Sequence, residues 1–133
     1  MLHSSRKLKV MIVDDMPAMR SILLDMLRGR TYVDGIEFED ADSAWDFLIA
    51  GETSAVDLIL LDVVLPGMSG LDLVRAVRSH PHLERTRILM ITSEGRLDHV
   101  DEAMRSGADG YLVKPFQETR LLEWVDRFFP LNV

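Results

Sequence analysis

Four short apolar runs, each followed at once by a polar residue, are the feature that most constrains the fold of this chain. The runs are residues 10–13, 56–61, 88–91 and 111–113. Runs of this length, interrupted here only by Asp57, are typical of strands that are buried on both faces, as in a parallel sheet. The sequence therefore predicts four inner strands, with other elements covering both sides of the sheet.

A fifth strand and five helices complete the predicted pattern. Residues 35–39 alternate apolar and polar side chains, which indicates an edge strand with one wetter face. Apolar residues recur at helical spacing over residues 16–27, 44–49, 71–77, 97–104 and 121–129. Strands that alternate with helices imply parallel pairing and right-handed crossovers. We therefore predict an α/β fold built from five βα units.

The predicted helices carry start and stop signals. Pro17 stands near the start of the first helix, where proline is tolerated. Asp42 and Ser43 precede the second helix and are typical N-cap residues. The third, fourth and fifth helices are followed by Pro81, Gly107 and Pro130.

Length and charge restrict the classes of protein to consider. A chain of 133 residues fits one domain, which we expect over residues 8–130, with tails over residues 1–7 and 131–133. Cysteine is absent, which excludes disulfides and thiolate metal sites. The net charge of −7 disfavours nucleic-acid binding and favours hard cations or basic partners. The polar N-terminus and the shortness of the apolar runs predict neither a secretory signal nor a membrane span.

The polar residues that end the apolar runs are expected to meet in space. The carboxyl ends of parallel strands lie along one edge of a sheet, and open α/β sheets bind ligands there. The residues at this edge are Asp14, Asp15, Asp62, Thr92 and Lys114. Two carboxylates about 4 Å apart repel by about 4 kcal/mol at an effective dielectric of 20, so three of them call for a compensating cation. Oxygen ligands of this kind suit Mg²⁺.

The same five residues could support phosphoryl transfer. A carboxylate such as Asp62 can act as a nucleophile and form an aspartyl phosphate. Lys114 can neutralise phosphoryl oxygens, and the hydroxyl of Thr92 can donate a hydrogen bond to them. Phosphoryl transfer requires little of a protein beyond such positioning and charge stabilisation.

At these positions the chain resembles the CheY-like receiver domain of two-component response regulators. The matching stretches are residues 13–15, 61–62, 66–70, 92–94, 107–111 and 114–116. Together, in this order and spacing, they are highly specific, and the resemblance extends over nearly the whole chain. It implies a flavodoxin-like, doubly wound sandwich with a five-stranded parallel sheet in the strand order 2-1-3-4-5.

The resemblance also implies a role for each residue of the acidic group. Asp62 is expected to be the phosphoacceptor. Asp15 is expected to bind Mg²⁺, or Mn²⁺, directly, and Asp14 to bind it directly or through water. The backbone carbonyl of Val64, two residues after Asp62, is expected to provide a further ligand.

The remaining implied roles concern the response to phosphorylation. Thr92 is expected to bond the phosphoryl group, Lys114 to pair with its oxygens, and Tyr111 to be the aromatic switch residue. The peptide bond between Lys114 and Pro115 is expected to be cis, whereas only about 5–6% of X-Pro bonds are cis. The surface that changes is expected over residues 97–106, 109–113 and 118–129.

The expected partners also follow from the resemblance. They are a sensor histidine kinase or a histidine phosphotransfer protein, which supplies the phosphoryl group, and a downstream effector protein. We expect no binding to nucleic acid or membrane, and a cytoplasmic location. The chain is expected to be a signalling switch and not an enzyme, since it would catalyse only its own phosphoryl transfer and autodephosphorylation.

Other interpretations remain open at the level of sequence. Asp14 and Asp15 could simply cap the helix that follows them. The chain could be a pseudo-receiver that is never phosphorylated, or the N-terminal part of a longer regulator. A phosphatase with an aspartyl nucleophile usually carries a second acid two residues later, where this chain has Val64.

Overall fold

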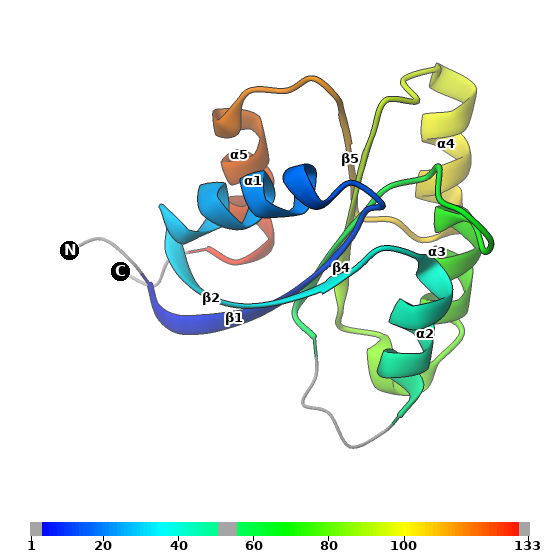
Figure 1. The fold of residues 1–133 in the computed structure, drawn as a ribbon, viewed down its shortest axis with the longest axis horizontal. Helices are drawn as coiled ribbons and strands as arrows, with labels where there is room; N and C mark the ends of the chain where they lie inside the picture. The colour runs from blue at the N-terminus through cyan, green and yellow to red at the C-terminus, as the bar shows by residue number, and fades with distance from the viewer. Residues whose placement is uncertain (1–3, 51–55, 131–133) are drawn as a thin grey trace.

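One five-stranded parallel sheet organises the computed structural model, which describes residues 4–50 and 56–130 (Figure 1). The strand order is β2-β1-β3-β4-β5, so the predicted flavodoxin-like topology is confirmed. The strands are β1 (Ser4–Val13), β2 (Thr31–Phe38), β3 (Leu58–Leu61), β4 (Arg87–Thr92) and β5 (Gly110–Val113). Residues 1–3 and 131–133 of the predicted tails lie outside the described residues.

Within residues 4–50 and 56–130, five α-helices cover the two faces of the sheet. They are α1 (Pro17–Arg28), α2 (Ala41–Ile49), α3 (Gly70–Arg78), α4 (Leu97–Ser106) and α5 (Glu118–Phe128), with a short 3₁₀ turn η1 (Pro81–Leu83) after α3. Helices α1 and α5 lie on one face, and α2, α3 and α4 lie on the other (Figure 1). None of the helices in the described part of the chain is both long and apolar enough to span a bilayer.

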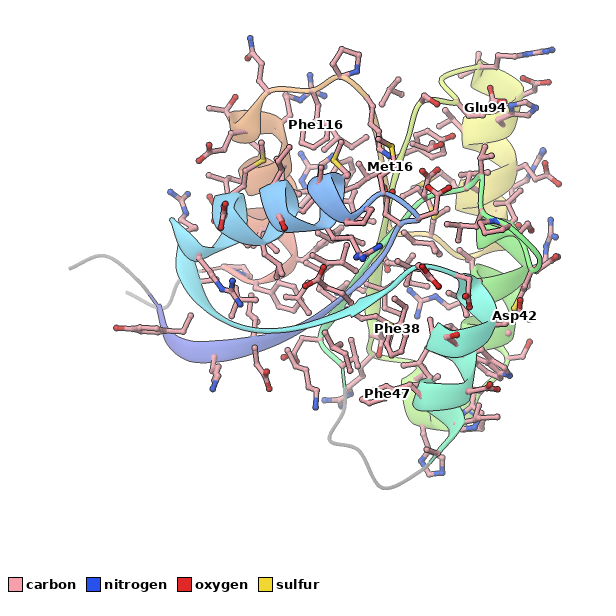
Figure 2. All side chains as sticks on the ribbon, in the orientation of Figure 1. Met16, Phe38, Asp42, Phe47, Glu94 and Phe116 are labelled. Atoms are coloured by element: carbon pink, nitrogen blue, oxygen red, sulfur yellow. The ribbon has the colours of Figure 1, made fainter. Side chains whose placement is uncertain are left out.

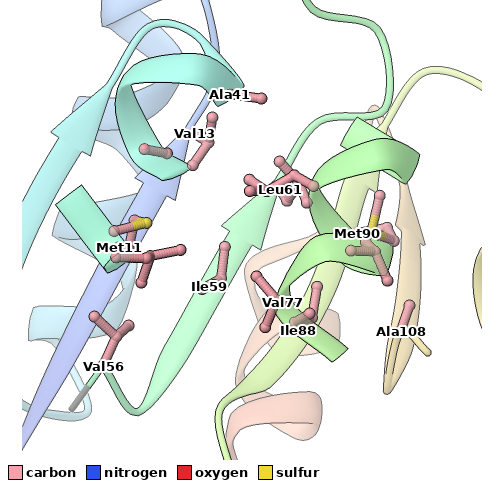
Figure 3. Packing of buried hydrophobic residues seen from close by; sticks show 14 of the residues in the cluster. Met11, Val13, Ala41, Val56, Ile59, Leu61, Val77, Ile88, Met90 and Ala108 are labelled. Atoms are coloured by element: carbon pink, nitrogen blue, oxygen red, sulfur yellow. The ribbon is translucent and has the colours of Figure 1, made fainter. Parts of the chain in front are cut away.

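Each face of the sheet has its own hydrophobic core. Along β1, Met11 and Val13 pack toward α2 and α3, whereas Val10 and Ile12 pack toward α1 and α5. Figure 3 shows the first of these cores from close by. All four side chains are fully buried, and burial of a large apolar side chain contributes roughly 1.5–3 kcal/mol. Burial of consecutive residues on opposite faces explains why the inner strands read as continuous apolar runs.

The edge strand β2 is longer than the sequence indicates. The alternating pattern predicts a strand over residues 35–39, but β2 begins at Thr31. The additional residues pair with β1, with Val33 opposite Leu8 and Asp34 opposite Lys9. The pairing explains why β1 itself begins at Ser4, within the predicted N-terminal tail of residues 1–7.

The N-cap of α2 differs from the prediction. The helix begins at Ala41, and the carboxylate of Asp40 accepts a hydrogen bond from the backbone N–H of Ser43 at 2.7 Å. The predicted cap residues Asp42 and Ser43 therefore lie inside the first turn. Asp42 has a different partner, because its carboxylate accepts the backbone N–H of Met68 at 3.2 Å.

The ends of the later helices follow the predicted signals with one shift. Helix α3 ends at Arg78, and Pro81 opens the turn η1 instead of ending the helix directly. Gly107 ends α4 with φ of 120°, a backbone conformation that favours glycine. Helix α5 ends at Phe128, two residues before Pro130.

Helix α4 keeps much of its apolar stripe at the surface. Leu97 is 75% exposed and Met104 is 40% exposed, whereas Ala103 is the one fully buried residue of the helix. The periodicity therefore predicts the helix correctly, but only part of its stripe reaches the core.

Candidate functional site

Three aspartates meet at the carboxyl edge of the sheet. Asp14 and Asp15 follow β1, and Asp62 follows β3. Each offers a carboxylate oxygen, and these oxygens all lie within 4.8 Å of one another. Asp14 and Asp62 are buried, whereas Asp15 is exposed. Two carboxylates of the cluster are therefore buried, and the third is exposed to solvent.

Lys114, which follows β5, bridges the two buried carboxylates. Its Nζ donates hydrogen bonds to Oδ2 of Asp14 at 2.8 Å and to Oδ2 of Asp62 at 3.1 Å. Burial opposes the charge on Lys114, but its bonds to the two aspartates outweigh burial and raise its pKa. The peptide bond between Lys114 and Pro115 is cis, as predicted.

Backbone donors fix the orientation of both buried carboxylates. Oδ1 of Asp14 accepts the N–H of Met16 at 2.9 Å, and Oδ1 of Asp62 accepts the N–H of Val64 at 3.0 Å. Figure 2 labels Met16 in the segment that joins β1 to α1. Rigid carboxylates hold their lone pairs in fixed directions, which favours a single ligand geometry.

The charge and chemistry of the cluster fit a divalent hard cation. Three carboxylates and one ammonium group leave a formal charge of −2. Oxygen donors are the ligands that Mg²⁺ prefers, and it typically binds through one or two carboxylates while waters fill the rest of its shell. Within residues 4–50 and 56–130, this is the one group of three acidic or histidine side chains close enough to hold a metal.

Thr92 ends the neighbouring strand β4 and is completely buried. Its Oγ1 accepts the backbone N–H of Glu94 at 3.4 Å. Its carbonyl accepts the backbone N–H of Lys114 at 2.8 Å, which joins the ends of β4 and β5. The structure therefore places Thr92 next to the lysine that contacts Asp62.

Tyr111 connects β5 to the loop that follows β4. Its hydroxyl donates a hydrogen bond to the carbonyl of Glu94, the residue whose N–H Thr92 accepts. Burial, assisted by the negative charges of Glu94 and Asp62, raises the pKa of Tyr111. The hydroxyl therefore stays a hydrogen-bond donor at neutral pH. Glu94 is labelled beside α4 in Figure 2.

Sequence patterns do not reveal one residue at this edge, Arg20 of α1. Its Nη1 donates to the carbonyl of Asp14 at 2.6 Å, and its Nε donates to the carboxylate of Glu37 on β2 at 2.9 Å. The sequence indicates this contact only weakly. Arg20 lies one turn into the helix that follows Asp15, and Glu37 occupies a polar position of the alternating strand.

Gly70 allows α3 to approach the backbone of Asp62. A Cβ at position 70 would lie 2.2 Å from the carbonyl oxygen of Asp62 and 2.8 Å from Cα of Val63. We expect Gly70→Ala to lower the free energy of unfolding of the domain by about 1–3 kcal/mol, because the backbone must move to accept the methyl group. Urea unfolding measures the loss.

Gly29→Ala is the matched control for Gly70→Ala. Gly29 has φ of −70°, and its nearest neighbour to an added Cβ is the Met26 carbonyl at 3.4 Å, an ordinary contact. We expect the free energy of unfolding of this variant to lie within about 1 kcal/mol of that of the parent. Equal stability of the two alanine variants would contradict the close approach of α3 to Asp62.

Comparisons with known proteins agree on one family. The sequence model of the family described as "Response regulator receiver domain" matches residues 10–126. The chemotaxis protein CheY of Pseudomonas aeruginosa is 37% identical over 122 residues, which cover 92% of this chain and 96% of that protein.

Solved structures give the same result. The chemotaxis protein CheY4 of Vibrio cholerae superposes with a TM-score of 0.78 at 32% identity, covering 93% of this chain and 100% of that one. The beryllofluoride-activated receiver domain of DrrB, from Thermotoga maritima, has a TM-score of 0.78 at 25% identity, covering 92% and 97%.

Proposed function

The chain belongs to the response regulator receiver domain family, and we propose that Asp62 accepts a phosphoryl group from a histidine kinase, or from a histidine phosphotransfer protein, and thereby switches partner binding. The observation that carries the proposal is the cluster of three carboxylates within 4.8 Å of one another, bridged by Lys114. The domain that we propose spans residues 8–130 and includes the matched residues 10–126.

A divalent cation is part of the proposal. Asp14, Asp15, Asp62 and the backbone carbonyl of Val64 would hold Mg²⁺, or Mn²⁺. The bound cation would supply positive charge next to the transferred phosphoryl oxygens. The excess negative charge of the cluster supports this assignment, because Lys114 alone leaves two carboxylate charges uncompensated.

Each side chain of the site would have its own role in phosphoryl transfer. An Asp62 carboxylate oxygen would form a bond to phosphorus as the bond from phosphorus to the donor histidine nitrogen breaks, and that nitrogen keeps the electron pair. The N–H of Val64 holds one oxygen of Asp62, and Lys114 contacts the other. From this position Lys114 would balance the charge of the new phosphoryl oxygens, which is a form of electrostatic stabilisation.

The switch would start at Thr92 and reach the surface through Glu94. If the hydroxyl of Thr92 turns to donate to the phosphoryl group, its present contact with the N–H of Glu94 changes. The carbonyl of Glu94 accepts a hydrogen bond from the hydroxyl of Tyr111. One loop residue therefore joins the two switch residues, and it lies three residues before the exposed Leu97 of α4.

The surface formed by α4, β5 and α5 would transmit the change to a downstream effector protein. Leu97, Met104 and Val113 of this surface are exposed apolar residues. To move a conformational equilibrium from 1:99 to 99:1, phosphorylation must stabilise the active state by about 5.5 kcal/mol. As a receiver domain the chain is a signalling switch, and we propose that it catalyses only its own phosphorylation and dephosphorylation.

A pull-down with and without a beryllofluoride mimic tests this function. The mimic suits the experiment because the structure of the DrrB receiver domain has been solved in a beryllofluoride-activated state. We expect the mimic plus Mg²⁺ to change which proteins the chain retains, and Asp62→Asn to retain the same set with or without it. Identical sets for the parent under both conditions would contradict the switch.

Val64 is expected to lengthen the life of the phosphoryl group. The residue is 60% exposed and lies two residues after Asp62, and its apolar side chain offers no group to orient an attacking water. We expect Val64→Asn to shorten the phosphoryl half-life several-fold, as measured by the decay of the phosphorylated mass. Ile49→Asn changes a residue of similar chemistry that is 46% exposed at the end of α2, and should leave the half-life unchanged. A half-life that stays equal or rises in Val64→Asn would contradict this role.

A further inference from the structure

Arg20 ties the acidic end of β1 to the edge of the sheet. It lies in the first turn of α1, and only 15% of its side chain is exposed. Its guanidinium donates to a backbone carbonyl, that of Asp14, and to a carboxylate, that of Glu37. A planar guanidinium presents its donors in a fixed fork, so two partners hold it in one orientation.

The carbonyl of Asp14 belongs to the peptide plane that joins Asp14 to Asp15. A hydrogen bond of 2.6 Å from Arg20 to this oxygen therefore restrains the plane from which Asp15 projects. Other contacts hold Asp14 itself, because its N–H donates to the Phe38 carbonyl and its carboxylate contacts Lys114.

Asp15 lacks such support of its own. It is exposed, and no other group in the described part of the chain donates a hydrogen bond to its carboxylate. Its carboxylate nevertheless lies within 4.8 Å of those of Asp14 and Asp62. The direction of Asp15 therefore depends on the backbone that precedes it, and that backbone is restrained by Arg20.

Glu37 completes the arrangement from β2. It lies opposite Ile12 in the register of β1 and β2, two residues before Asp14, so the sheet itself fixes its position. Its carboxylate anchors Nε of Arg20 and offsets the guanidinium charge, which would otherwise repel a cation at the nearby cluster.

We propose that Arg20, anchored by Glu37, is a positioning residue of the cation site: it holds the Asp14–Asp15 peptide so that the Asp15 carboxylate faces the other two. This inference rests on the proposed function, because it requires a cation at the cluster. It assigns Arg20 no contact with the cation or with the phosphoryl group.

Positioning and simple charge have opposite effects on cation binding. Removal of a positive charge near the cluster would tighten binding by Coulomb attraction. Removal of a positioning contact would weaken binding, because partners that orient metal ligands typically contribute 10–100-fold to metal affinity. The sign of the change in dissociation constant therefore separates the two roles.

The test is the Mn²⁺ dissociation constant, measured from free Mn²⁺ by electron paramagnetic resonance on the whole chain. We expect Arg20→Gln to raise this constant about tenfold. Glu37→Leu should also raise it, because the guanidinium loses its anchor. Arg78→Gln is the matched control: Arg78 contacts a carbonyl and a carboxylate, those of Gly107 and Asp109, at the opposite edge of the sheet. Its variant should bind Mn²⁺ like the parent.

Each outcome decides the inference. A dissociation constant for Arg20→Gln that equals or falls below that of the parent, with native circular dichroism, overturns it. If Arg20→Gln does not fold, Arg20→Lys takes its place, since it keeps the positive charge but loses the planar fork that holds both partners. Unchanged binding in that variant overturns the inference. Equal weakening in Arg78→Gln would also overturn it, since the effect would then be general destabilisation. A parent chain that binds no Mn²⁺ would instead overturn the proposed cation site itself.

Discussion

Replacing Asp62 with asparagine is expected to abolish phosphorylation of the chain by acetyl phosphate in the presence of Mg²⁺. The amide keeps the shape of the carboxylate, but its single oxygen can accept from only one of the two present donors, the N–H of Val64 or Nζ of Lys114, because these contact different oxygens of Asp62. It has no anionic oxygen to attack phosphorus, so the nucleophile is lost while the fold is retained. Intact-mass spectrometry should show one added phosphoryl group on the parent, removable by hydroxylamine, and none on Asp62→Asn.

Asp57→Asn is the matched control for this experiment. Asp57 precedes β3 at the end of the strand opposite Asp62, and its carboxylate accepts the backbone N–H of Lys9 at 2.9 Å. This variant should gain the phosphoryl group as fully as the parent. Labelling of Asp62→Asn to the level of the parent would show that another residue is the nucleophile.

Mg²⁺ is expected to raise the melting temperature of the parent by roughly 10 °C at a hundred times its dissociation constant. A ligand that binds only the folded state stabilises it by about 2.7 kcal/mol at that concentration. For a domain of 133 residues, one kcal/mol corresponds to about 4 °C. Differential scanning calorimetry at increasing Mg²⁺ measures the rise.

Asp15→Ala should remove this rise and also change the metal-free protein. Asp15 is the exposed member of the cluster, so its truncation leaves no buried group without a partner. Without Mg²⁺ the variant should melt above the parent, because one of three mutually repelling carboxylates is gone. With excess Mg²⁺ the order should reverse. A parent that gains nothing from Mg²⁺, or a variant that gains as much, would contradict a cation site at these carboxylates.

The fold could be predicted because the signals for it are local. An apolar run such as Leu58–Leu61, buried along its whole length, reads as an inner strand without knowledge of its neighbours. The first half of β2 gave no such signal, because residues 31–34 have no continuous apolar run and are defined as strand by their pairing with β1. The cap of α2 was misplaced because several candidate cap residues follow one another, and only backbone geometry selects Asp40.

The candidate site divides in the same way. Strand ends brought Asp14, Asp62 and Lys114 together as predicted, since parallel strands fix where their last residues lie. The contact of Arg20 with a carbonyl could not be predicted, because backbone oxygens leave no trace in a sequence pattern. For the same reason the carbonyl of Glu94, the acceptor for Tyr111, was not anticipated.

The exposure of Asp15 above two buried aspartates has a kinetic consequence. A cation that binds the proposed site would meet solvent at this one exposed carboxylate. Loading would then be a fast exchange with the surrounding pool of metal, and not a slow event tied to folding. The fraction of domains with a bound cation, and therefore able to react, would then stay in equilibrium with the free Mg²⁺ concentration and change as quickly as that concentration changes.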